Sequence, residues 1–303
     1  MRVRCSLEGG GISILSTFVL LVASLSSAAS SQFTVYTVNY PLQYFAQRIA
    51  GDTVKVVFPT PSDVDPALWK PDVATIGRFQ KADLILLNGA NYAKWVKTAS
   101  LPRSRVIDTS RRFRDRYIQL ENLVRHTHGP GGEHAHGDFA FTTWLNFRFA
   151  ADQAKAIERA LIRKLPAYKE QLKGNYIALE KDLLSLDGWM KRVVGMNATR
   201  PLVASHPVYE YLARRYDLNL QSVHWEPDTF PGPRQWVALK ALLQEHRARW
   251  LMWEDEPIPR SIKTLKALGV NSVVFRPAGN VPPSGDFLST MQRNIENLIP
   301  VFE

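Results

Sequence analysis

Cysteine is almost absent from this sequence, since Cys5 is the single one among 303 residues. Cys5 precedes the apolar segment 12–23, whereas attachment of a bacterial lipid would require a cysteine just after such a segment. If the N-terminal segment is removed, the remaining chain has no thiol. This excludes a disulfide framework, a zinc–thiolate site and a cysteine nucleophile. We therefore expect a protein without a lipid anchor that relies on a large hydrophobic core.

Long apolar runs are also scarce, and the strongest one lies at the N-terminus. Arg2 and Arg4 precede the apolar segment 12–23, and small residues follow it at 27–29. The segment is shorter than the roughly 20 residues that span a bilayer, and this order of features is typical of a secretory signal peptide. We predict that residues 1–29 are a cleaved signal peptide and that the protein is exported to the periplasm. A retained N-terminal anchor helix is the alternative.

Motifs of several large enzyme classes are missing. The sequence contains no G-x-S-x-G nucleophile elbow, no H-E-x-x-H helix and no Walker loop. Ser205 stands next to His206, but this pair alone does not make a catalytic set. We therefore expect that the protein is not an enzyme.

Acidic residues are the minority, because 38 lysines and arginines face 28 aspartates and glutamates and give a formal net charge of +10. The basic residues are dispersed, and acids interrupt the densest stretch, RVIDTSRRFRDRY at 105–117. No nucleic-acid-binding motif accompanies them. We interpret the charge as a solvated surface that faces an anionic envelope, and we expect no nucleic-acid partner.

Strand-like and helical patterns alternate over the first part of the chain. The predicted strands are 33–39, 53–59, 83–89 and 104–110, and the predicted helices between them are 40–51, 72–82 and 92–99. Gly51 is well suited to end the first of these helices. Strands that alternate with helices at short spacing predict a parallel sheet with βαβ crossovers.

A long helical region follows. Leucines and tyrosines recur every three to four residues between about 150 and 194. Pro166 and Gly174 interrupt this pattern, so we predict one helix over 149–164 and a second from Pro166 into the region of Arg192. At 1.5 Å per residue the second helix would be about 40 Å long, which is long for a helix within one small domain. We expect it to bridge two parts of the molecule.

Alternation resumes after this helix. The predicted strands are 200–207, 220–225, 248–255 and 271–277, and the predicted helices are 208–218, 233–247, 260–269 and 287–302. The sequence therefore predicts an α/β protein with two doubly wound parallel-sheet lobes, joined by a long helix, with a ligand cleft between the lobes. The expected boundaries are 33–165 for the N-terminal lobe, 166–194 for the linking helix and 199–303 for the C-terminal lobe.

Four of the 7 histidines cluster in HTHGPGGEHAHG, at His126, His128, His134 and His136. The glycines and the proline at 129–132 disfavour regular structure, so we expect a loop over 126–137. Neutral imidazoles on a mobile segment bind zinc, nickel or copper(II). Because ordering a loop costs about 1–2 kcal/mol per residue, this binding should be weak. We expect the loop to collect metal, and a linker with incidental histidines is the alternative.

The order of these segments resembles the metal-binding solute-binding proteins of zinc and manganese ABC transporters. The resemblance covers about residues 33–303 and rests on YPLQYFAQRIAGD, DPALWKP, KADLILLNG, the His-rich loop, TTWLN, ASHPVYEYLARRYDL and FRPAGN. It implies an exported receptor with two α/β lobes joined by a rigid helix. Such a receptor holds one metal ion between its lobes and delivers the ion to a membrane permease. Zinc-specific members often carry a His-rich loop at this place.

Three of the four metal ligands that the resemblance implies are replaced. The family pattern has histidines where this sequence has Ala67 and Thr142, and an aspartate where it has Arg276. His206 is the one ligand that remains. Ala67 cannot coordinate a metal, the Thr142 hydroxyl is a poor neutral donor, and Arg276 brings a positive charge.

Two interpretations of the cleft remain open. In the first, other groups of the second lobe complete a metal site around His206, and Arg276 pairs with one of the carboxylates. The candidate ligands are His224, Glu226, Asp228, Glu254, Asp255 and Glu256. In the second, the cleft binds a metal chelate or an anionic organic ligand through Arg276 and the tryptophans Trp69, Trp225 and Trp253. Each of these side chains also has an ordinary structural explanation, as core packing, an ion pair or a solvated loop.

These observations predict the exported solute-binding component of an ABC uptake system for a divalent transition metal, with zinc as the first choice. The His-rich loop and the interlobe cleft would capture the ion, and a membrane permease would receive it. Trp69, Thr142, Asp255 and Arg276 are expected to line the cleft, and the protein is expected to be a monomer. The alternative is a divergent receptor of the same fold that binds a chelate or a non-metal solute, or that acts as a sensor or scaffold.

Replacing His126, His128, His134 and His136 together by alanine should remove at least one weak zinc-binding event, because the imidazoles are the metal-binding groups of this loop. Isothermal titration calorimetry of the variant and the unmodified protein measures this loss. An unchanged isotherm would reduce the segment to a linker.

Overall fold

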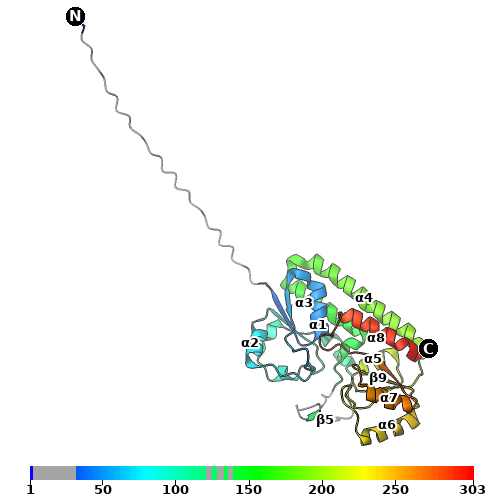
Figure 1. The fold of residues 1–303 in the computed structure, drawn as a ribbon. Coiled ribbons are helices and arrows are strands. Elements are labelled where there is room, and N and C mark those ends of the chain that lie inside the picture. The colour runs from blue at the N-terminus through cyan, green and yellow to red at the C-terminus, as the bar shows by residue number, and fades with distance from the viewer. Residues whose placement is uncertain (3–31, 121–124, 128–132, 136–138) are drawn as a thin grey trace. The chain divides into compact units, whose positions relative to one another are not determined.

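The computed structural model describes residues 1–2, 32–120, 125–127, 133–135 and 139–303 (Figure 1). The predicted signal peptide therefore lies mostly outside the described residues. Residues Gln32–Glu303 form one compact unit. In the described part of the chain, no helix combines the length and the apolar character that a membrane crossing requires.

The first sheet contains four parallel strands in the order β2-β1-β3-β4. These strands are β1 (Thr34–Thr37), β2 (Lys55–Val57), β3 (Leu84–Leu87) and β4 (Val106–Asp108). Helix α1 (Tyr40–Ala50) follows β1 and ends at Gly51, whose φ of 56° places it in the left-handed region that glycine adopts readily. Helix α2 (Val73–Lys81) begins after Asp72, whose side chain accepts a hydrogen bond from the Thr75 amide. All four predicted strands and both of these predicted helices are confirmed.

The second sheet is also parallel, with the order β10-β9-β7-β8. Its strands are β7 (Leu202–Ala204), β8 (Leu220–Ser222), β9 (Trp250–Trp253) and β10 (Asn271–Val274). The helices that connect and follow them are α5 (Glu210–Tyr216), α6 (Pro233–His246), α7 (Pro259–Ala267) and α8 (Phe287–Phe302). The predicted architecture of two parallel-sheet α/β lobes is therefore confirmed.

Two helices lie between the lobes along the chain. Helix α3 (Phe147–Lys164) begins two residues before its predicted start, because the Asn146 side chain caps it by accepting hydrogen bonds from the amides of Arg148 and Phe149. A short 3-10 helix (Pro166–Tyr168) then leads into α4 (Lys169–Gly195), which has 27 residues. The expected interruption at Gly174 is wrong, because this residue lies inside α4.

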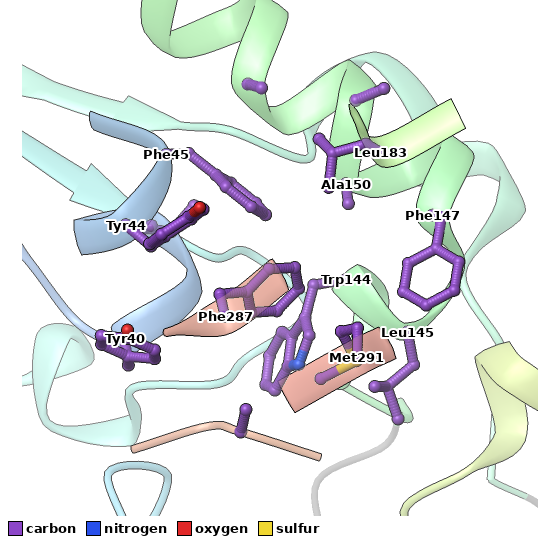
Figure 2. Packing of buried hydrophobic residues seen from close by; sticks show 14 of the residues in the cluster. Tyr40, Tyr44, Phe45, Trp144, Leu145, Phe147, Ala150, Leu183, Phe287 and Met291 are labelled. Carbon is purple, nitrogen blue, oxygen red and sulfur yellow. The ribbon is translucent and has the colours of Figure 1, made fainter. Parts of the chain in front are cut away.

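One hydrophobic core connects both lobes through these helices. It includes Val35 and Leu84 of the first sheet, Leu202 and Met252 of the second, and Leu183 of α4. Helix α8 packs against α4. Its Phe287 ring packs edge to face on the Phe45 ring of α1, with the ring centroids 5.2 Å apart (Figure 2). The C-terminal helix thus contributes to the packing of the first lobe as well as the second.

The prediction of a helix over 92–99 is wrong. Residues Ala90 and Asn91 have left-handed φ angles of 48° and 57°, and a short 3-10 helix, η2 (Lys94–Lys97), follows them. The local pattern of apolar residues was compatible with a helix, but the turn leaves too few residues for one.

The backbone of the His-rich segment also differs from the expected loop. Strand β5 (Arg125–Thr127) pairs antiparallel with β6 (Glu133–Ala135), and His126 is opposite His134 in the register. His128 and His136 lie outside the described residues.

A buried ion-pair cluster attaches α4 to the second lobe. The carboxylate of Asp187 in α4 is 5% exposed and accepts hydrogen bonds from the guanidinium of Arg215 at 2.8 and 2.7 Å and from the Tyr216 hydroxyl at 3.1 Å, both in α5. Burial alone would raise the pKa of Asp187, but the hydrogen bonds from Arg215 outweigh it and lower that pKa. The ionised Asp187 carboxylate therefore stabilises the fold fully above the ordinary pKa of an aspartate. This stabilisation is lost as the pH falls through the lowered pKa of Asp187.

The substitution Asp187→Asn should lower the free energy of unfolding by about 2–4 kcal/mol, because it leaves the Arg215 guanidinium and the Tyr216 hydroxyl without their carboxylate partner. Urea denaturation followed by circular dichroism measures the change. The matched control is Asp182→Asn, which breaks a more exposed pair with Arg48 and should cost less than about 1 kcal/mol. Equal losses for the two variants would contradict the role of this cluster.

Candidate metal centre

A cavity of about 600 Å³ lies between residues of the two lobes. The first lobe and the segment before α3 contribute residues 62–68, Tyr92, Lys94, Phe141, Thr142 and Trp144. The second lobe contributes His206, Val208, residues 226–228, Glu254, Asp255 and residues 277–280. This volume falls within the range of about 300–1,000 Å³ that is common for ligand sites. The predicted interlobe cleft therefore corresponds to a defined cavity.

Three side chains in this cavity form a group that could hold one metal ion. His206, Glu226 and Glu254 each offer one ligand atom, and these atoms all lie within 4.8 Å of one another. His206 Nε2 is 3.8 Å from Glu226 Oε1, and His206 Nδ1 is 3.3 Å from Glu254 Oε1. The imidazole is buried, whereas the two carboxylates are partly exposed toward the cavity. One nitrogen and two oxygen donors could supply three of the four ligands of a tetrahedral divalent metal site.

Parallel-sheet geometry explains this convergence. His206 follows β7, Glu226 follows β8 and Glu254 follows β9, and these three strands are neighbours in the second sheet. Backbone hydrogen bonds continue past the strand ends, because the Ser205 amide donates to the Met252 carbonyl and the Trp225 amide donates to the Ser205 carbonyl, both at 2.8 Å. The three side chains therefore leave the same edge of the sheet, where doubly wound proteins bind their ligands.

Arg276 follows β10 and is held from two sides. Its guanidinium donates to Asp255 Oδ1 at 2.8 Å and to Glu256 Oε1 at 3.1 Å. Its backbone amide donates to Oδ1 of the buried Asn294 in α8, and its carbonyl accepts from Nδ2 of the same residue, at 2.9 and 2.7 Å. Two carboxylates thus offset the positive charge of Arg276, where the first interpretation of the cleft expected a pair with one of them.

One segment of the second lobe is tied to the first lobe at the cavity. The Gly279 carbonyl accepts from the Tyr40 amide at 3.0 Å, and the Pro277 carbonyl accepts from Trp144 Nε1 at 2.7 Å. Asn280 Nδ2 donates to the carbonyls of Pro61 and Val64 at 2.7 and 2.8 Å. We call residues 277–280 the interlobe strap, because they connect the two walls of the cavity by direct hydrogen bonds.

Residues 35–300 match the protein family described as "ZnuA: Zinc-uptake complex component A periplasmic". The chain belongs to this family. The zinc-binding lipoprotein AdcA of Streptococcus pneumoniae is 23% identical over 94% of the chain, and the chain spans 58% of AdcA's length. The metal ABC transporter substrate-binding lipoprotein FimA of Streptococcus parasanguinis is 26% identical over 84% of each protein.

Solved structures of similar fold support the architecture. The metal-dependent lipoprotein YcdH of Bacillus subtilis superimposes with a TM-score of 0.76 at 21% identity and covers 88% of this chain and 98% of its own. The Zn(II)-bound ZnuA-like domain of Streptococcus pneumoniae AdcA gives a TM-score of 0.75 at 22% identity and covers 89% and 98%. The resemblance to metal-binding solute-binding proteins is thereby confirmed. The absence of a lipid anchor stays a prediction, and several ZnuA-family relatives are named lipoproteins.

The first-lobe wall has the two residues at which the family pattern expects histidines. Ala67 is buried and offers a methyl group to the cavity. The Thr142 hydroxyl donates to the Val208 carbonyl at 2.6 Å, so its proton is already engaged with the second lobe. Within the described residues, the cluster of potential metal donors comes from the second lobe alone.

The other residues that the sequence predicted for the cleft have different surroundings. The His224 ring is 5.9 Å from the His206 ring, measured between centroids, and is perpendicular to it, but His224 is not part of the three-donor group. Asp255 lines the cavity, whereas Glu256 does not, and both are partners of Arg276. Trp69 packs against the main core, and Trp225 and Trp253 are buried in a second core cluster. None of these tryptophans, nor Arg276, is among the residues that line the cavity.

Sequence patterns missed the charged residues of the first-lobe wall. Asp63, Asp65 and Lys94 line the cavity from loops and from η2, where no regular periodicity points to them. Burial lowers the pKa of Lys94, and the negative charge of Asp65 acts in the opposite direction. The described lining has six acidic residues, Asp63, Asp65, Glu226, Asp228, Glu254 and Asp255, and one lysine. In a chain of net charge +10, this local excess of negative charge favours a cation.

Introducing Ala67→His together with Thr142→His should strengthen zinc binding at least tenfold, or about 1.4 kcal/mol, because it adds two donors on the wall opposite His206. The gain should disappear when His206→Ala is added. Zinc competition against a fluorescent chelator measures the affinities. Val281→His is the matched control, because Val281 is exposed and does not line the cavity. An equal gain in that variant would show that the added imidazoles act elsewhere.

Proposed function

We propose that the protein is the metal-capturing component of an ABC uptake system and that its cargo is a divalent transition metal ion, zinc first. The observation that carries this proposal is the convergence of His206, Glu226 and Glu254 at one edge of the second sheet. A neutral imidazole and two carboxylates carry a charge of two minus, which balances a divalent cation. Membership of the ZnuA family and the zinc-binding names of the AdcA relatives support the same conclusion.

The cargo is proposed to be held mainly by the second lobe. The first-lobe wall supplies Ala67 and Thr142 at the expected ligand positions, so a bound ion would retain coordination positions open to water. Zinc accepts four or five ligands, and harder ions such as manganese prefer oxygen donors and water. We therefore expect weaker zinc binding and weaker discrimination against manganese than a site with several imidazoles would give.

The acidic lining also argues for a cation over the alternative cargo. An anionic chelate or organic acid would meet six carboxylates and one ammonium group in the described cavity wall. The side chains considered for such a ligand do not line the cavity. After capture, delivery of the ion to a membrane permease is the step that family membership suggests, and the His-rich segment is proposed to raise the local supply of metal.

Zinc titration of the protein whose four clustered histidines are replaced by alanine tests the cavity site by itself. His206→Ala or Glu254→Gln in this background should weaken binding at least tenfold, since each removes a donor and every tenfold change is about 1.4 kcal/mol. Glu245→Gln is the control, because Glu245 is exposed on α6 of the same lobe. Unchanged affinity in His206→Ala would refute the proposed site, and stronger binding of a citrate complex than of the free ion would favour a chelate receptor.

A further inference from the structure

A second cavity, of about 210 Å³, lies in the first lobe beyond the carboxyl ends of β3 and β4. Asn88 follows β3 directly, and Asp108 is the last residue of β4. This edge of a doubly wound sheet is a usual place for a ligand. None of the three proposed metal donors lines this cavity, so ligand binding there can be tested separately from metal capture.

The turn that forms one wall of this cavity is held in an uncommon conformation. Gly89, Ala90 and Asn91 follow one another with φ angles of 80°, 48° and 57°. Left-handed backbone costs a residue with a side chain on the order of 1 kcal/mol, and such strain is concentrated at functional sites. The turn is fixed by its surroundings, because the Ala90 amide donates to the Tyr117 hydroxyl at 3.1 Å. A side chain at position 89 would collide with the Ser110 hydroxyl.

Charged groups of both signs face the same cavity. Lys97 and Arg114 line it, and in the described part of the chain neither forms an ion pair. Asp108 lines it as well, and its Oδ1 accepts hydrogen bonds from the amide and hydroxyl of Ser110 at 3.1 and 2.9 Å. A carboxylate has about four acceptor positions, so the second oxygen retains capacity for a ligand donor.

The charges of Asp108 and Arg114 both act on Tyr117, which lines the same cavity. Burial raises the pKa of Tyr117, the negative charge of Asp108 adds to this rise, and the positive charge of Arg114 opposes it. Both charges therefore act on one phenol at the cavity wall. The lining also has apolar side chains, which include Ala93, Val96 and Phe139.

We propose that this cavity is a binding site for a free α-amino acid with a small apolar side chain. Arg114 and Lys97 would bind the α-carboxylate, since a guanidinium matches the geometry of a carboxylate. Asp108 would accept hydrogen bonds from the α-ammonium group, and the side chain would rest against Val96 and Phe139. The volume, below the usual range for drug-sized ligands, suits a molecule of this size.

The site also adjoins the metal cavity. Tyr92 lines both cavities and is itself buried. Its ring packs edge to face on Phe141 and Trp144, with centroid separations of 5.3 and 5.6 Å, and both of these rings line the metal cavity. An amino acid bound in the first lobe would therefore contact a side chain that also forms the cleft wall.

Calorimetric titration of the full, metal-free protein with L-leucine tests the proposal against two matched probes. The first probe, 4-methylpentanoate, is leucine without its ammonium group, and the second, 3-methylbutylamine, is leucine without its carboxylate. Leucine should bind at least tenfold more tightly than either probe, a difference of about 1.4 kcal/mol. Equal binding of 4-methylpentanoate would overturn the amino-acid assignment in favour of a site for simple carboxylates.

Single substitutions test whether leucine binds in this cavity. Arg114→Ala and Asp108→Asn should each weaken leucine binding at least tenfold, and Asp108→Asn should leave the affinity for 4-methylpentanoate unchanged. Arg111→Ala is the control, because Arg111 is exposed on η4 (Arg111–Arg116), the 3-10 helix that also carries Arg114, and does not line the cavity. His206→Ala should bind leucine normally, which separates this site from metal capture. Absence of leucine binding at millimolar concentration, or equal binding by all variants, would refute the proposal.

Discussion

The packing of α4 against α1, α3 and α8 is the constraint on which the rest of the structure depends. A parallel sheet must be covered on both faces, and these helices join residues of both sheets in one continuous core, whereas a second core cluster packs against the second sheet. Phe287 of α8 and Phe45 of α1 meet in this core, although α8 follows the second sheet in the chain. Because the helices fix the position of each sheet, the carboxyl ends of the strands in both lobes contribute to one cavity. The buried pairing of Asp187 with Arg215 adds a polar connection at the place where α4 meets the second lobe.

Charge is distributed unevenly in relation to this cavity. The protein as a whole is strongly basic, yet the described cavity wall is acidic. Arg276 is directed to Asp255 and Glu256, whereas Glu254 faces His206. At a separation of about 4 Å, an uncompensated unit charge would cost a bound cation on the order of 4 kcal/mol at an effective dielectric of 20. The two ion pairs of Arg276 reduce this penalty, and Asn294 keeps the backbone of Arg276 in the position that allows them.

Much of the fold could be predicted from the sequence because parallel strands and amphipathic helices leave strong periodic patterns. All eight strands of the two sheets, and the long α4, followed from such patterns. The same logic pointed to His206, Glu226 and Glu254, since residues that follow neighbouring strands must share an edge. The sequence pattern could not predict that Glu254 faces His206 while Glu256 pairs with Arg276. The directions of these side chains depend on tertiary contacts. The charged first-lobe residues Asp65 and Lys94, and the left-handed turn at Ala90, depend on tertiary packing that leaves no local periodic signal.

The interlobe strap bears on how quickly a bound ion could leave. Residues 277–280 make four hydrogen bonds to the other wall, so the walls cannot separate at that edge without breaking them. Separation elsewhere would not remove a single donor of the described cluster, because His206, Glu226 and Glu254 all belong to one wall. In a site whose ligands are divided between two lobes, opening dismantles the coordination shell and release is fast once the lobes part. Here the residence time of the ion would instead be set by the loops after β7, β8 and β9, and by any competing ligand that reaches the ion while its donors stay together.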